Sequence, residues 1–216
     1  MLKLDGVRVT IKGFVILRGI SLEVPAGGLI GLVGRNGAGK TTTLKSIMGI
    51  LPVSAGSIRL NGSDLLRVPA HRRAQLGIGY MPEDRRLIGA LSVEDNILLP
   101  VWASGLEGGR ERLSYIYDLM PDVRELASRR ASQLSGGQQK LVALARALMS
   151  GTKLLLLDEP FEGLSPAFGA KLAATIQDLR RARLSVLMAE SDLKRIGFSD
   201  MIYTIERGEI VELTPR

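Results

Sequence analysis

The sequence of 216 residues contains no cysteine, a single histidine (His71) and few aromatic residues. The lack of cysteine excludes disulfide bonds, thiolate nucleophiles and cysteine-based zinc sites, and one histidine excludes a histidine-rich metal centre. Aromatic residues make up only 4% of the chain, so we expect an aliphatic core. Any metal chemistry must therefore use oxygen ligands.

Long apolar segments are also missing. No run approaches the ~20 apolar residues with which a helix crosses a bilayer. The first residues, MLKLDGVRV, lack the apolar block of a signal peptide. With 45% hydrophobic and 24% charged residues, the composition excludes disorder and allows a sizeable core. We therefore expect a soluble, cytosolic protein with one large or two small domains.

The chain is basic, with 29 lysine and arginine residues against 22 acidic residues and a net charge of +7. Such a balance is compatible with nucleic acid, anionic lipid or small anionic ligands as partners. The positive residues are dispersed and form only short pairs: Arg72-Arg73, Arg85-Arg86, Arg129-Arg130 and Arg180-Arg181. Dispersed charge is typical of a solvated surface, so the charge alone identifies no partner.

Two short apolar runs predict central parallel strands covered on both faces. LIGLV at 29–33 leads into a glycine-rich stretch, and LLLL at 154–157 leads into two acidic residues. Helical periodicity is present at 41–48 and at 138–149, and each of these segments ends near a glycine. These patterns predict the order strand, phosphate-binding loop, helix.

The remaining pattern indicates two additions to this α/β core. Alternating residues at 2–11 and 20–24 predict an antiparallel flap before the core. Strand-like runs vanish between about 87 and 134, which predicts a helical insert. Its helices are expected at 93–99 and 110–119, broken by Pro100, Gly108-Gly109 and Pro121. The last elements are expected as a helix at 166–182 and strands at 185–189, 201–206 and 209–213.

GRNGAGKT at 34–41 matches the pattern G-x-x-x-x-G-K-[ST] between a buried strand and a helix, the context that this motif requires. Glycines let consecutive backbone N–H groups point into one concavity, and the helix N-terminus adds partial positive charge. A nucleoside triphosphate fits such a cradle, with Lys40 on the β- and γ-phosphates and Thr41 on Mg²⁺. The predicted ATP-binding residues are Gly34, Arg35, Asn36, Gly37, Ala38, Gly39, Lys40, Thr41 and Thr42.

The acidic pair that follows the second apolar run completes this chemistry. Asp158 ends a buried strand, where a carboxylate is costly to desolvate unless it meets a cation. We expect it to hold Mg²⁺ directly or through water. Glu159 lies one residue further and is predicted to polarise the attacking water. A loop acid that caps the next helix is the alternative interpretation.

LSGGQQ at 134–139 lies between the phosphate-binding loop and LLLLDE. With this segment the sequence resembles the ATP-binding cassette (ABC) ATPases, whose signature is LSGGQ. Because they start a helix, Ser135, Gly136, Gly137 and Gln138 predict a second anion site. The resemblance implies that this site closes over the nucleotide of a second ABC ATPase subunit, so that a homodimer or heterodimer sandwiches two ATP molecules.

The resemblance covers essentially the whole chain. YMPEDRR at 80–86 stands at the family's glutamine loop, which implies that Glu83 touches Mg²⁺ and couples the helical insert to a membrane partner. FEGLSP at 161–166 and KSIMGILPVSAGSIRLNG at 45–62 are most similar to the short second cassette of branched-chain amino acid, amide and urea importers. Sugar-import cassettes share the PEDR form of the segment at 80–86, but they usually consist of two fused cassettes, whereas this chain contains one.

Two positions depart from the family pattern. Ser191 in AESD stands where the family's switch histidine is expected, so it is our candidate for the γ-phosphate sensor. Ile11 stands where an aromatic residue normally stacks on adenine, and Phe14 lies nearby. Apolar packing by Ile11 could cover the base without aromatic stacking.

The resemblance implies an α/β fold of the P-loop NTPase type, an ABC nucleotide-binding domain. Its parallel core sheet is expected beside an N-terminal antiparallel β-subdomain. Residues 1–216 would form a single domain, with a catalytic core at about 1–86 and 135–216 and a helical subdomain at about 87–134.

The implied function is the ATP-hydrolysing subunit of an importer, peripheral on the cytoplasmic face of the cell membrane. It would act with transmembrane permease subunits and, indirectly, with a periplasmic or extracellular solute-binding protein, and without nucleic acid. The alternatives are a soluble ABC ATPase in nucleic-acid repair, translation or cofactor assembly, a cassette for sugar import or for export, and a non-hydrolysing regulator.

Overall fold

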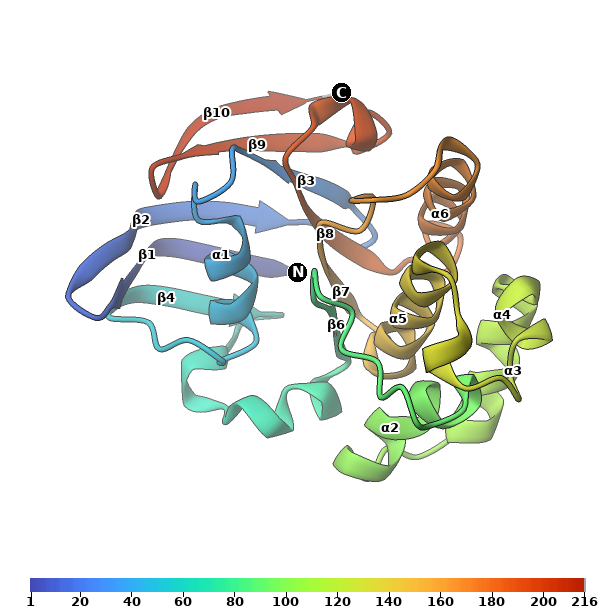
Figure 1. Cartoon of the computed structure of the whole chain (residues 1–216). Helices are drawn as coiled ribbons and strands as arrows, with labels where there is room; N and C mark the ends of the chain where they lie inside the picture. The colour runs from blue at the N-terminus through green and yellow to red at the C-terminus, as the bar shows by residue number, and fades with distance from the viewer. Residues whose placement is uncertain (216) are drawn as a thin grey trace.

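The computed structural model describes residues 1–215, which form two β-sheets with helices around them (Figure 1). The smaller sheet is antiparallel and has the strand order β2-β1-β4-β5. Leu2 and Leu4 of β1 are buried while Lys3 is exposed, because successive side chains of a strand point to opposite faces. The strands are β1 (Leu2–Ile11), β2 (Phe14–Val24), β4 (Ala55–Leu60) and β5 (Ser63–Asp64).

The larger sheet has six strands in the order β10-β9-β3-β8-β7-β6. All neighbouring pairs are parallel except β10 and β9. Parallel pairing places the carboxyl ends of β3, β7 and β8 at one edge of the sheet. The strands are β3 (Leu29–Val33), β6 (Ile78–Met81), β7 (Leu154–Asp158), β8 (Ser185–Glu190), β9 (Met201–Glu206) and β10 (Glu209–Pro215).

The two faces of the larger sheet belong to different cores. Leu154 and Leu156 pack on the side of α1 and the antiparallel sheet, together with Leu44 of α1. Leu155 and Leu157 pack on the opposite side with α5 and α6. Strand β7 is therefore apolar at every position before its terminal aspartate, since both of its faces are covered.

The helices lie on these two sides and at one end of the molecule (Figure 1). Within residues 1–215, no helix is long and apolar enough to cross a membrane. The α-helices are α1 (Lys40–Ile47), α2 (Val93–Ser104), α3 (Gly109–Leu119), α4 (Pro121–Glu125), α5 (Gly136–Ser150) and α6 (Pro166–Asp178). Short 3-10 helices span Leu65–Arg67, Ala70–Arg72, Ala74–Leu76, Ala131–Gln133 and Leu193–Ile196.

The expected parallel strands, the flap and the helical insert are present. Pro100 was wrongly expected to end the first helix of the insert, because α2 continues through it to Ser104 and ends at Gly105. Proline lacks one backbone N–H donor, but Ile97 of the same helix packs in the core with α5 and α6, and this packing keeps the segment helical. Pro121 opens α4 rather than only breaking a helix, since proline is favoured at the first helical position. Strands β4, β5 and β6 were not predicted.

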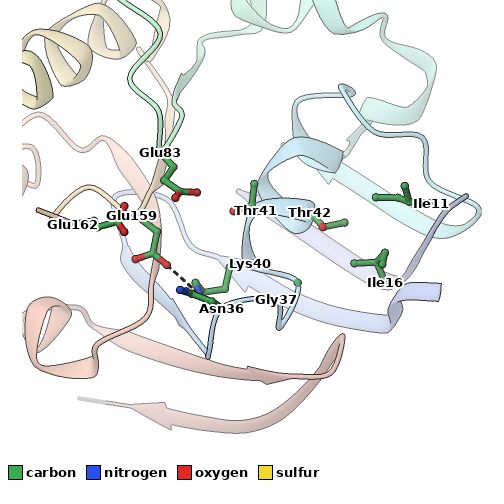
Figure 2. Close-up of a pocket in the computed structure, with 11 residues that line it drawn as sticks. Ile11, Ile16, Asn36, Gly37, Lys40, Thr41, Thr42, Glu83, Glu159 and Glu162 are labelled. Carbon is green, nitrogen blue, oxygen red and sulfur yellow. Dashed lines mark ion pairs between the residues drawn. The ribbon is translucent and has the colours of Figure 1, made fainter. Parts of the chain in front are cut away.

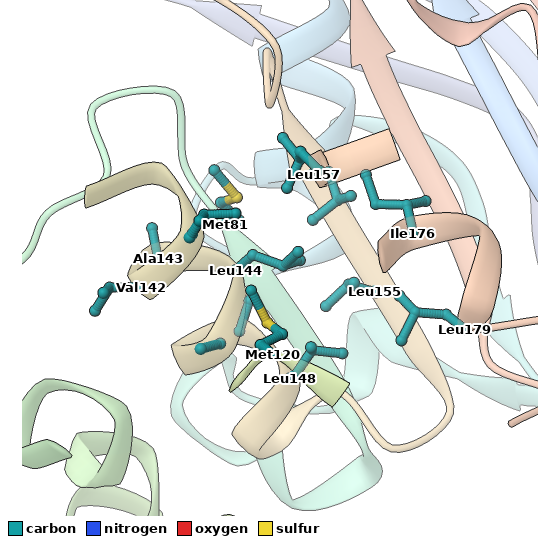
Figure 3. Packing of buried hydrophobic residues seen from close by; sticks show 14 of the residues in the cluster. Met81, Met120, Val142, Ala143, Leu144, Leu148, Leu155, Leu157, Ile176 and Leu179 are labelled. Carbon is teal, nitrogen blue, oxygen red and sulfur yellow. The ribbon is translucent and has the colours of Figure 1, made fainter. Parts of the chain in front are cut away.

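The core between α5 and the larger sheet is tight (Figure 3). Leu144 and Leu148 of α5 pack against Leu155 and Leu157 of β7. The close approach depends on Gly79 in β6, because a Cβ built there would lie 2.1 Å from the carbonyl oxygen of Ala147. This contact sets how closely α5 lies on the sheet.

We expect Gly79→Ala to destabilise the protein by about 1–3 kcal/mol, because the added methyl group pushes α5 away from β6. The matched control is Gly169→Ala in α6, where an added Cβ has open space within 4 Å. This control should be neutral or stabilising by about 0.5–1 kcal/mol, since alanine favours a helix. Urea unfolding measures both, and equal stability of the two variants would contradict the packing argument.

Candidate nucleotide-binding site

The loop between β3 and α1 has a shape that only glycine permits at two positions. A Cβ at Gly34 would lie 2.3 Å from the carbonyl oxygen of Ile205. Gly39 has φ 117° and is the N-cap of α1, and a Cβ there would lie 2.8 Å from Leu17. The loop therefore bends so that α1 starts with its N-terminus beside a cavity of about 480 Å³, a size typical of ligand sites.

Lys40 lies at the first position of α1 and is only 5% exposed. Its Nζ donates to the carbonyl oxygens of Gly34 at 2.7 Å and Arg35 at 3.3 Å. It also forms an ion pair with Oε1 of Glu159 at 3.0 Å (Figure 2). The ammonium group is thus held inside the cavity, next to the loop that the motif assigns to phosphates.

Asp158, at the end of β7, lies directly beside α1. Its Oδ1 accepts a hydrogen bond from Thr41 Oγ1 at 2.9 Å, and its Oδ2 accepts one from Tyr80 OH at 3.2 Å. Burial raises the pKa of Asp158, although both hydrogen bonds oppose the shift. A buried carboxylate paired only with neutral hydroxyl groups is suited to a cation.

These residues fit Mg²⁺ held together with a nucleotide rather than by protein alone. No cluster of three or more His, Cys, Asp or Glu side chains within residues 1–215 could hold a metal ion. Mg²⁺ commonly takes one or two protein oxygens and completes its shell with substrate phosphates and water. Thr41 and Asp158 supply such oxygens, and Glu83 lines the same cavity.

Glu159 follows Asp158 with a left-handed backbone (φ 47°) that turns its side chain toward Lys40. Ser191 Oγ donates to its carboxylate, 2.7 Å from Oε1 and 2.8 Å from Oε2, and the Ser191 N–H donates at 3.2 Å. Burial raises the pKa of Glu159, but the hydrogen bonds from Ser191 and Lys40 outweigh burial and bring it below its ordinary value. The carboxylate is therefore ionised, as a water-polarising base must be.

Glu190, the last residue of β8, is a second buried carboxyl group next to Glu159. Its Oε1 accepts the Phe161 N–H at 2.9 Å, and its Oε2 lies 3.6 Å from Nη1 of Arg195. Burial is the main cause that raises the pKa of Glu190 to about 7, and the negative charge of Glu159 adds to it.

The cavity collects most of the predicted ATP-binding residues. Figure 2 shows Lys40 and Glu159 at one end and Ile11 at the other, beside Thr42. The predicted residues that line it are Ile11, Asn36, Gly37, Gly39, Lys40, Thr41, Thr42, Glu83 and Glu159. Gly34 and Ala38 are buried in the loop, and Arg35 lines a neighbouring cavity.

Phe14 does not line this cavity, and 74% of its surface is exposed. Ile16, two residues along β2, lines the cavity together with Ile11 instead. Phe14 pairs with Ile11 at the end of the hairpin, and the register shifts between the pairs Thr10–Val15 and Val9–Leu17, so that Ile16 is the extra residue of a β-bulge. Such a bulge interrupts the alternation of side chains, so Phe14 and Ile16 need not face the same way. The apolar end of the cavity is therefore aliphatic.

The signature segment lies elsewhere, at the start of α5. Ser135 Oγ accepts the Gln138 N–H at 3.3 Å, and Gln138 Oε1 accepts the Ser135 N–H at 2.9 Å, which makes a capping box. Ser135 and Gly136 are exposed, and neither they nor Gly137 and Gln138 line the cavity at Lys40. This potential anion site is open to another molecule.

Sequence reasoning missed several residues of the site. Tyr80 donates to Asp158 and Ile16 lines the cavity. Their positions depend on the register of β6 and β2, which no local sequence pattern predicts. Glu162 lines the cavity from the loop after β7. Lys140 and Glu190 are buried ionisable residues, and a charged residue inside an apolar run was the one available signal.

A phosphate-binding loop between a parallel strand and a helix, with a buried aspartate and a glutamate at the end of a neighbouring strand, defines a P-loop nucleoside triphosphatase. Residues 17–162 match the family described as ABC transporter. The chain therefore belongs to the ABC transporter family and is an ATP-binding, ATP-hydrolysing cassette, as the signature predicted.

Two curated relatives illustrate the range of this family. The high-affinity branched-chain amino acid transport ATP-binding protein BraG of Pseudomonas aeruginosa is 34% identical over 212 residues, covering 98% of this chain and 91% of the relative. The lipopolysaccharide export system ATP-binding protein LptB of Escherichia coli K12 is 34% identical over 203 residues, covering 93% and 84%. The family is thus shown, whereas the transported substrate differs between relatives.

Solved structures agree with the fold. The dimeric structure of the bacterial ABC transporter cassette MJ0796 is similar with a TM-score of 0.88 and 25% identity, covering 100% of this chain and 98% of the other. A dimeric post-hydrolysis state of that cassette with ADP and Pi is also similar, with a TM-score of 0.88. The predicted ABC-type α/β fold is confirmed, and cassettes of this family dimerise and work with transmembrane subunits.

We expect Glu190→Gln to flatten the pH dependence of stability. The pKa of Glu190 is about 7 in the folded protein and 4.5 for the unperturbed group, so between these values the native state keeps a proton that the unfolded chain loses. The stability from this group is present below pH 4.5 and is lost as pH rises through about 7.

As pH rises from about 5 to about 8, the free energy of unfolding of the wild-type protein should therefore fall by up to about 3 kcal/mol more than that of Glu190→Gln. Urea unfolding between pH 5 and pH 8 measures the difference. The exposed Glu212→Gln variant on β10 is the control and should keep the wild-type slope. Equal slopes for Glu190→Gln and the wild type would contradict the assignment.

Proposed function

We propose that this chain is the ATP-hydrolysing subunit of an ABC importer, and that its solute is a branched-chain amino acid or a related small molecule. The observation that carries the catalytic part is the ion pair between Lys40 and Glu159 inside the cavity, beside Asp158 and Thr41. The solute is proposed from the similarity to BraG over 98% of this chain.

In this proposal, ATP lies along the cavity with its base over Ile11 and its phosphates at residues 34–42. Lys40 exchanges its contact with Glu159 for the β- and γ-phosphates, which leaves the Glu159 carboxylate free to polarise water. Mg²⁺, held by Thr41 and Asp158 with Glu83 nearby, would neutralise charge on the phosphates.

Ser191 has a positioning role in this proposal. Its hydroxyl and N–H both donate to Glu159, and its Oγ lies 3.5 Å from Asn36 Oδ1 in the phosphate loop. It therefore connects the water-polarising carboxylate to the loop, although a serine cannot supply the charge of a histidine. Hydrolysis would then depend strongly on Glu159.

The complete site needs a second cassette. Ser135, Gly136, Gly137 and Gln138 are proposed to bind the γ-phosphate held by the partner's phosphate loop, because they do not reach the cavity of their own chain. The loop with Glu83 is tied to α5, since Arg146 Nη1 donates to the Arg86 carbonyl at 2.7 Å. Closure of two cassettes would thereby move the helical insert and the proposed membrane subunits docked on it.

The proposed location is the cytoplasmic face of the membrane, with a solute-binding protein acting on the other side. Export is the second candidate, because the exporter cassette LptB is as similar as BraG in percentage identity. Import is favoured by the FEGLSP loop and by the greater share of the chain that BraG covers.

We expect Glu159→Gln to double its solution mass when ATP and Mg²⁺ are added, because blocked hydrolysis traps two cassettes around the nucleotide. Multi-angle light scattering measures the mass with and without nucleotide. Glu159→Gln combined with Lys40→Ala should stay monomeric, since it loses the phosphate contact. A monomer that still binds ATP would contradict self-assembly and indicate a different cassette as the partner.

We expect deletion of the gene in its native host to abolish most high-affinity uptake of radiolabelled leucine, isoleucine and valine. The wild-type gene should restore uptake and Glu159→Gln should not, because both proteins fold but only one hydrolyses ATP. Unchanged uptake in the deletion strain would contradict the proposed solutes, but it would not contradict the assignment of the chain as an ATPase.

A further inference from the structure

A lysine outside every predicted motif is completely buried behind the catalytic site. Lys140, in the second turn of α5, is only 1% exposed. Its Nζ donates to the backbone carbonyl oxygen of Glu159 at 2.5 Å. Burial lowers the pKa of the Lys140 ammonium, so keeping the charged group there has a cost.

The carbonyl group that Lys140 contacts belongs to a residue with a strained backbone at the start of a turn. Glu159 has a left-handed backbone (φ 47°), which is strained for a residue with a side chain. Its carbonyl also accepts the Glu162 N–H at 3.3 Å, so Lys140 holds the turn that starts there. The turn directs the Glu159 carboxylate toward Lys40 and Ser191.

The same segment is held from the other side by a buried carboxyl group. Glu190 accepts the Phe161 N–H at 2.9 Å. The backbone from Glu159 to Phe161 therefore lies between a buried lysine of α5 and a buried glutamate of β8. An apolar side chain of similar size at residue 140 would fill the space at less cost, yet it would leave the Glu159 carbonyl without this donor.

We propose that Lys140 is a positioning residue for hydrolysis, which links the signature helix α5 to the Glu159 carboxylate. The inference rests on the proposed role of Glu159. Lys140 lies five residues after Ser135 on the same helix, so a displacement of the signature segment by a partner's nucleotide displaces Lys140 with it. Contact between two cassettes would thereby adjust the residue that polarises water in each of them.

The test is Lys140→Met in the full chain, which keeps the length of the side chain and removes the donor. Single-turnover hydrolysis of radiolabelled ATP should slow about tenfold or more, the value of a charge-assisted hydrogen bond, while the ATP dissociation constant stays within about twofold. Lys140→Gln keeps an N–H donor on a shorter side chain and should recover part of the rate. A loss of ATP affinity equal to the loss of rate would overturn the proposal.

A second readout does not depend on activity. Amide hydrogen exchange at Glu162 should accelerate in Lys140→Met, because its acceptor at Glu159 is no longer held. The matched control is Leu144→Ala, one turn further along α5, which removes core packing but no hydrogen-bonding group. This control should lower stability and leave the hydrolysis rate and the Glu162 exchange as in the wild type. Unchanged Glu162 exchange in Lys140→Met would overturn the inference.

A double-mutant cycle separates this inference from the proposed role of Glu159. If Lys140 acts through Glu159, Lys140→Met should cause little further loss of rate in a Glu159→Gln background. An equal further loss in that background would overturn the inference and leave the role of Glu159 standing. A wild-type rate for Glu159→Gln alone would instead overturn the proposed role of Glu159.

Discussion

The parallel pairing of β3, β8 and β7 is the constraint on which the rest of the structure depends. Residue Val33 pairs with Glu190 and Asp158 pairs with Ala189, so the three strands end at the same edge. Thr41 and Asp158 lie 117 residues apart in sequence, yet they are in hydrogen-bond contact. The charged and polar side chains of the cavity are carried by segments that leave this edge, whereas Ile11 and Ile16 come from the antiparallel sheet.

Buried charge is the second feature that organises the site. Lys40, Asp158, Glu159, Lys140 and Glu190 are all buried, and each has at least one polar partner. These partners offset the cost of desolvation only in part, because burial still raises the pKa of Asp158 and Glu190 and lowers that of Lys140. At Glu159 the hydrogen bonds from Ser191 and Lys40 outweigh burial and bring the pKa below its ordinary value. A nucleotide would enter a site whose charges are already positioned, which is how electrostatic catalysis avoids reorganisation.

The two segments that are predicted to bind anions lie at different surfaces. The loop at Lys40 opens into the cavity, whereas Ser135 is exposed at the start of α5. Helix α5 nevertheless contacts both regions, because Lys140 reaches the Glu159 carbonyl and Arg146 holds the loop after Glu83. These two hydrogen bonds are the structural basis of the proposed link between the signature segment and the Glu159 carboxylate.

The sequence alone determined the family, the phosphate loop, the acidic pair and the central strands, because each depends on residues close together along the chain. It also predicted that Ile11 lies at the nucleotide cavity. Only the tertiary structure decided that α2 continues through Pro100, that Ile16 rather than Phe14 faces the cavity, and that Tyr80, Lys140 and Glu190 surround the acidic pair. These outcomes depend on strand register and on which side chains share a buried space, and neither is encoded by local spacing.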